Sequence, residues 1–131
     1  MASDHVTLSV PAKGEWARTV RMTASSVATG AGASVELLEE IRLAVDEAYV
    51  HACETGSPSG RIDMEFEIGP GEFRLRIGPL NGPRPAPDGG EAEVVARYSR
   101  FIIEAVCDEF EEDCEDDSVY LVLCKRLTPA E

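Results

Sequence analysis

Apolar and polar positions follow two different periods along the first half of the chain, and each period predicts a kind of element. Residues 6–10 alternate apolar and polar side chains, as in a strand with one buried face. In residues 15–28 apolar side chains recur at helical spacing, and the Gly-Ala-Gly segment at 30–32 ends this predicted helix. Ser34 suits the N-cap of a second helix. The apolar stripe of that helix comprises Leu37, Leu38, Ile41, Val45, Ala48 and Ala52.

The second half alternates β-structure with one more helix. The pattern predicts two strands, at residues 61–68 and 72–77, joined by a Gly-Pro-Gly turn. Residues 78–90 hold four prolines and four glycines, which predicts a lid-like loop instead of a regular element. A third helix is predicted over residues 91–107. Its core-facing side chains are expected to be Val94, Tyr98, Phe101 or Ile102, and Ala105.

Carboxylates dominate the segment that follows. Residues 108–117 hold eight of them, and this run is expected to begin as a strand and to end as a solvated turn. Residues 118–125 alternate again and predict a final strand. The order strand, helix, helix, strand, strand, loop, helix, strand, strand indicates an α+β two-layer sandwich. No repeat or boundary interrupts the pattern, so residues 1–131 are expected to form a single domain.

The net charge of −13 changes the picture of possible partners. It argues against direct nucleic-acid binding, because phosphate contacts need clustered lysines and arginines. It suits a protein partner with a basic surface, although an acidic surface that serves only solubility is the alternative. No apolar stretch approaches the ~20 residues of a membrane helix, and the N-terminal residues lack a signal-peptide pattern. A cytoplasmic location without membrane contact is therefore expected.

The four cysteines show no C-x2-C spacing and are not dense enough for a disulfide scaffold. Free thiols are the favoured interpretation, and a redox-sensing pair among the last three is the alternative. With only two histidines in the chain, no metal site is expected. The cysteines are Cys53, Cys107, Cys114 and Cys124, and the histidines are His5 and His51.

The segment at residues 41–48, Ile-Arg-Leu-Ala-Val-Asp-Glu-Ala, closely resembles the N-box of the RsbW/SpoIIAB-type anti-sigma factors. That family belongs to the GHKL superfamily of histidine-kinase-like ATPases. The order of the predicted elements fits the same family over nearly the whole chain. The resemblance implies a Bergerat-type fold with a mixed or antiparallel sheet and three helices on one face. In active family members it also implies serine kinase activity with ATP and Mg²⁺.

The N-box resemblance implies roles for two positions. Glu47 matches the acid that helps activate the attacking hydroxyl in active members, and His51 takes the place of the asparagine that holds Mg²⁺. Side chains four residues apart share one helix face, so both are expected to point towards one site. A neutral imidazole is a poor ligand for Mg²⁺, which prefers oxygen donors. Glu47 is therefore interpreted as vestigial, with an ordinary surface carboxylate as the alternative.

Two further family motifs are altered. Pro79 or Leu80 stands where the family has an aspartate that accepts a hydrogen bond from adenine, and neither side chain accepts one. A recognition pocket without its polar partner loses discrimination by up to ~10⁴-fold. Asn81 and Gly82 resemble a remnant of the turn that follows. Residues 96–101, Ala-Arg-Tyr-Ser-Arg-Phe, lack the glycines that let backbone amides cradle phosphates. No nucleotide cofactor is therefore expected.

The resemblance also implies partners. In the family, this domain sequesters a sigma factor, and an anti-anti-sigma protein of the STAS type competes for an overlapping surface. Homodimers are common. The family's partner-contacting arginine corresponds to Arg18, next to Trp16, although Trp16 also suits a core position. The leading hypothesis is an anti-sigma factor without kinase activity. The alternatives are an active ATP-dependent serine kinase and a thiol-based redox-gated regulator.

Overall fold

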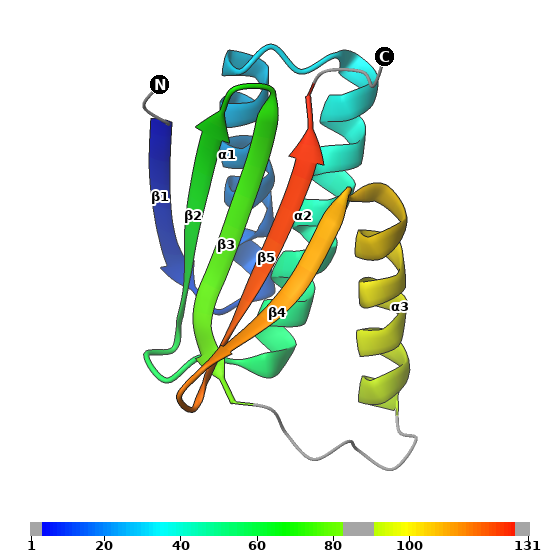
Figure 1. Cartoon of the computed structure of the whole chain (residues 1–131). Helices are drawn as coiled ribbons and strands as arrows, with labels where there is room; N and C mark the ends of the chain where they lie inside the picture. Colours follow the sequence, from blue (N-terminus) through cyan, green and yellow to red (C-terminus); the bar gives the residue numbers. More distant parts are fainter. Residues whose placement is uncertain (1–3, 83–90, 128–131) are drawn as a thin grey trace.

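The computed structural model describes residues 4–82 and 91–127, which form two layers (Figure 1). One layer is an antiparallel sheet with the strand order β1-β2-β3-β5-β4, and the helices cover one of its faces. This arrangement confirms the predicted α+β sandwich. The strands are β1 (Asp4–Pro11), β2 (Arg61–Gly69), β3 (Glu72–Asn81), β4 (Glu109–Glu115) and β5 (Ser118–Arg126). The helices are the short 3-10 helix η1 (Gly14–Trp16), α1 (Ala17–Gly30), α2 (Val35–Thr55) and α3 (Glu91–Val106).

Helix α2 packs against both other α-helices and carries the predicted apolar stripe. The Ser34 hydroxyl accepts a hydrogen bond of 3.2 Å from the Leu37 amide, so the predicted N-cap is confirmed. The helix ends at Gly56, whose φ of 80° suits a residue without a side chain. Its buried side chains are Ile41, Ala44, Val45, Ala48, Tyr49 and Ala52.

The core lies between α1, α2 and the inner face of the three central strands. Alternate residues of β2, β3 and β5 point into it, as the period of two predicts. Helix α1 contributes three fully buried small side chains, which let it approach closely. These core residues are Val20, Ala24 and Ala28 of α1, Ile62, Met64 and Phe66 of β2, Phe73, Leu75 and Ile77 of β3, and Val119, Leu121 and Leu123 of β5.

The first four residues of the predicted loop at 78–90 belong to a strand instead. Strand β3 continues to Asn81 because its pairing with β5 shifts register between Ile77 and Leu80 and then resumes. Leu80 is only 1% exposed, so its burial stabilises this extension. Pro79 cannot donate to a ladder, and the irregularity accommodates it. Residues 83–90, the rest of that predicted loop, lie outside the described residues.

The predicted buried face of α3 is wrong. Val94, Tyr98 and Phe101 are 62%, 63% and 70% exposed, and Ala105 is also exposed. Ser99 and Ile103 face the protein instead, at 1% and 0%. Apolar periodicity identifies a stripe but not the side from which a neighbour approaches. Helix α3 lies at one margin of the helix layer and packs against α2, so its opposite side has no helix beside it (Figure 1).

The carboxylate-rich run forms a strand for most of its length. Strand β4 pairs with β5 from Glu109 to Glu115, and the predicted turn is confined to the two residues that follow. Asp116 in that turn has a φ of 55°, a conformation that Asp tolerates better than most residues. Among the described residues, no helix is both long and apolar enough to cross a membrane.

Candidate functional site

The carboxylate of Glu47 is held by a buried serine of α3. The Ser99 hydroxyl donates a hydrogen bond of 3.0 Å to Glu47 Oε2, and Ser99 is 1% exposed. Both residues lie where α2 and α3 pack together. This hydrogen bond fixes the orientation of the carboxylate at the interface of the two helices. Sequence reasoning missed Ser99, because a serine within a helical apolar pattern gives no signal of its partner.

His51 lies one turn along the same helix and is partly buried. Burial is the main cause that lowers its pKa, and Arg100 lowers it further, whereas Glu112 and Glu54 act in the opposite direction. The imidazole is therefore biased towards its neutral form. The structure thus places Glu47 and His51 beside α3, with an uncharged side chain at the position that the resemblance gives to the metal ligand.

Arg100 is occupied by contacts with its own chain. Its guanidinium Nη2 lies 2.9 Å from Glu112 and its Nε lies 3.4 Å from Glu104. It also lies 5.8 Å from the centre of the Phe110 ring. These contacts fasten α3 to β4. A phosphate would have to compete with both carboxylates for this arginine.

Asn81 and Gly82 connect three parts of the fold. The Asn81 side-chain amide donates to the Thr55 carbonyl at 3.2 Å, and its backbone amide donates to the Gly56 carbonyl at 2.8 Å. A Cβ on Gly82 would come within 2.6 Å of the Asp117 carbonyl oxygen. Only glycine fits so close to the β4–β5 turn. These two residues therefore have a structural explanation that does not involve a nucleotide.

The structure describes the positions of the altered adenine motif but only part of the segment that lacks the phosphate-binding glycines. Leu80 points into the core and Pro79 is exposed, so neither presents a polar group for an adenine. The side chain of Ala96 and the pair Gly89-Gly90 lie outside the described residues.

The predicted partner-binding residues are both accessible. Trp16 is 39% exposed and Arg18 lies exposed in the first turn of α1. Trp16 is therefore not part of the buried core. Tyr49, which the sequence analysis did not single out, fixes the segment between β1 and η1. Its hydroxyl donates to the carbonyls of Lys13 at 2.6 Å and Pro11 at 3.1 Å, and burial raises its pKa.

The cysteines are free, and two of the three in the predicted redox group are buried or half-buried. Burial raises the pKa of Cys107 to about 12 and that of Cys124 to about 11. Cys107 lies near Lys125 and Glu40, on the helix side of the sheet. Cys124 is influenced by Arg74 and Glu72, and its backbone carbonyl accepts a hydrogen bond of 2.9 Å from the amide of Asp108, the residue after Cys107. Such thiols are poor nucleophiles at neutral pH. Cys114 is exposed on β4. It is paired with Val119, which lies five residues before Cys124 on β5.

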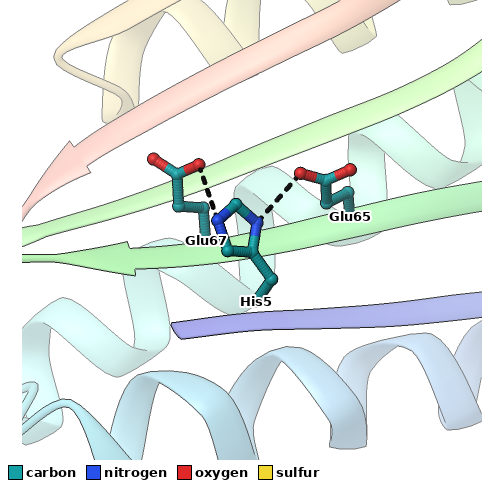
Figure 2. A group of neighbouring side chains, drawn as sticks. All are labelled: His5, Glu65 and Glu67. Atoms are coloured by element: carbon teal, nitrogen blue, oxygen red, sulfur yellow. Dashed lines mark hydrogen bonds and ion pairs between the residues drawn. The ribbon is translucent and has the colours of Figure 1, made fainter. Parts of the chain in front are cut away.

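A charged cluster that the sequence did not reveal lies on the open face of the sheet (Figure 2). His5 Nδ1 lies 3.0 Å from Glu65 and its Nε2 lies 3.5 Å from Glu67. Strand register explains the cluster, because His5 is directly opposite Glu67. Glu65 and Glu67 face different ring nitrogens of His5. The side chains are 37–48% exposed, so the ion pairs add little stability.

Comparisons with known proteins agree with this geometry. Residues 10–117 match the model of the histidine kinase-like ATPase domain. A serine-protein kinase RsbW from Listeria innocua is 26% identical over 139 aligned positions, covering 95% of this chain and 88% of that protein. The RsbW of Halalkalibacterium halodurans is 29% identical, covering 93% and 83%.

A solved structure supports the fold alone. It contains the RsbU and RsbW domains of a Mycobacterium tuberculosis protein and superposes with a TM-score of 0.70 at 20% identity. The match covers 97% of this chain but only 34% of that longer chain.

Proposed function

The chain belongs to the histidine kinase-like ATPase domain family, and we propose that it is an anti-sigma factor that acts by binding alone, without ATP or kinase activity. The observation that carries this proposal is the hydrogen bond from buried Ser99 to Glu47. It engages the one acidic group of the N-box that would act in phosphoryl transfer. His51 supports the same proposal because it supplies no oxygen ligand for Mg²⁺. Pro79 and Leu80 support it because neither side chain can accept a hydrogen bond from adenine.

The proposed partner is a sigma factor in the cytoplasm. Sigma factors bind DNA and present basic surfaces, which the net charge of −13 on this chain would attract over a distance. Arg18 and the exposed Trp16 offer the kind of side chains that dominate the energy of interfaces. Without phosphorylation, a STAS-type anti-anti-sigma protein would release the sigma factor by higher affinity for an overlapping surface. A homodimer is compatible with this scheme.

Co-purification of the chain with sigma factors from its own host, followed by titration of the purified pair, tests the proposal. We expect the same dissociation constant with and without ATP and Mg²⁺. Arg18→Ala should weaken the complex by about tenfold or more if Arg18 lies at the centre of the interface. A complex that forms only when ATP is present would contradict the proposal.

An active serine kinase is the second candidate, because the curated relatives are named serine-protein kinases and Glu47 is present in this chain. Incubation with ATP, Mg²⁺ and a STAS protein from the same host would reveal phosphoserine by mass spectrometry. Glu47→Gln must abolish any such signal, since a contaminating kinase would be unaffected. A robust, Glu47-dependent signal would replace the binding-only proposal.

The redox-gated regulator has less support. The raised pKa values of Cys107 and Cys124 disfavour the reactive thiolate form of both side chains. Thiol counts before and after peroxide treatment should therefore change only at exposed Cys114. Loss of two thiols with formation of an intramolecular disulfide would restore this candidate.

A further inference from the structure

Helix α3 presents an apolar stripe to solvent. Val94, Tyr98 and Phe101 follow one another at spacings of four and three residues, so they share one helix face. They are 62%, 63% and 70% exposed, and exposed Ala105 continues the stripe by a further turn. Single exposed apolar residues are normal on protein surfaces, but a row of large ones along one helix marks an interaction site.

The stripe is not needed to hold α3 in place. Ile103, fully buried, and the Ser99–Glu47 hydrogen bond attach the helix to α2. Arg100 attaches it to β4 through Glu112. The face that carries Tyr98 and Phe101 therefore points away from the contacts that position the helix. Its aromatic side chains are of the type that dominates the energy of interfaces.

The charges that border the stripe indicate what would cover it. Exposed Glu54 lies seven residues after Glu47, on the side of α2 that is next to α3, and exposed Glu104 of α3 is paired with Arg100. Arg97 and Arg100 are the cations of α3, and Arg100 is already paired with two carboxylates. A second copy of the chain would bring another net charge of −13 to this border. An apolar strip flanked by lysines or arginines complements it instead.

We infer that the α3 stripe, defined as Val94, Tyr98 and Phe101, is a docking surface for a basic amphipathic helix of the partner. The inference rests on the proposed function, and it names the region of the sigma factor that this chain would cover. The apolar side of the partner helix lies against Tyr98 and Phe101, as in helix-in-groove recognition. Its cationic side chains reach Glu54. This surface is separate from Arg18 at the start of α1, so the sigma factor would be held at two places.

The test uses the whole chain with the double substitution Tyr98→Ser and Phe101→Ser, and Val35→Ser as the matched control. Val35 is at the start of α2, where its side chain is 74% exposed and lies outside both proposed surfaces. Unchanged circular dichroism and melting would show that each variant folds. With the sigma factor that co-purifies with the wild type, the double variant should bind at least about tenfold more weakly and the control within about twofold. Glu54→Lys should weaken binding and reduce its dependence on salt.

A second measurement separates this inference from the proposed function. A synthetic amphipathic helix of leucine and lysine should bind the wild type and lose affinity for the double variant, whereas its scrambled form should bind neither. If the sigma factor binds the double variant as well as the wild type, the docking surface is overturned and the anti-sigma proposal stands. If no sigma factor binds, the anti-sigma proposal fails. In that case the synthetic helix decides about the docking surface. If the helix binds wild type and double variant equally, or binds neither, the docking surface is overturned as well. Self-association that the double substitution abolishes would assign the stripe to a second copy and overturn the inference.

Discussion

Helices α1 and α3 flank the same central helix, yet they are attached to it in different ways. Helix α1 buries Val20, Ala24 and Ala28 completely, and its close approach rests on small apolar side chains. Helix α3 buries Ile103 and Ser99, and it turns Tyr98 and Phe101 to solvent. The first helix is therefore part of the core. The second packs against α2 through Ile103 and Ser99, and its apolar side faces solvent.

The largest expected effect comes from the buried contact of α3. Ile103→Ala should lower the free energy of unfolding by about 2–5 kcal/mol, because it removes a fully buried side chain and leaves a cavity. Phe101→Ala, two residues away and 70% exposed, should change it by no more than about 0.5 kcal/mol. Urea denaturation of the two variants measures the difference. Similar losses from both would mean that the stripe is part of the core.

The next effect concerns the hydrogen bond between α3 and Glu47. Ser99→Ala leaves a partly buried carboxylate without its donor, and we expect a loss of about 1–2 kcal/mol. Ser26→Ala on α1 is the control, since this exposed serine should contribute little. Both are measured by urea denaturation at neutral pH. An unchanged stability for Ser99→Ala would show that the hydrogen bond does not help to hold α3.

A smaller effect is expected from the polar contact between α1 and α2. Arg21 Nη1 lies 3.2 Å from Asp46, and the two side chains are 39% and 32% exposed. Solvent screens such a pair, so Asp46→Asn should cost only about 0.2–1 kcal/mol, less at high salt. A loss larger than that of Ser99→Ala would reverse the comparison, because polar contacts would then matter more to α1 than to α3.

The smallest effect is a pH dependence beside α3. Burial lowers the pKa of His51 in the folded protein below its usual 6.5, so the unfolded chain binds a proton at higher pH. Stability is therefore fully present above about pH 6.5 and is lost progressively as the pH falls through the lowered value. His51→Gln should flatten this part of the curve when unfolding is followed by urea from pH 8 to 5. An identical slope in both proteins would contradict the burial of His51.

The two helices also show how far sequence reasoning reaches. The element order, the Ser34 cap and the apolar stripe of α2 followed from local patterns, because periodicity and capping are properties of neighbouring residues. The buried side of α3 did not follow, because a helix at the margin of its layer packs against its neighbours on a side that its own sequence does not specify. For Glu47 and His51, the sequence predicted a shared helix face, but not that Ser99 engages the carboxylate. The extension of β3 to Asn81 depended on pairing with β5, a contact far away in sequence.

The central claim is that this chain does not bind ATP and that its N-box carboxylate, Glu47, is instead engaged by Ser99 of α3. Isothermal titration of the whole chain with ATP and Mg²⁺, together with the melting temperature at the same concentrations, tests it most directly. We predict no measurable heat of binding and no rise in melting temperature, because a ligand stabilises only a folded state that it binds. Saturable binding with a matching rise in melting temperature would contradict the claim.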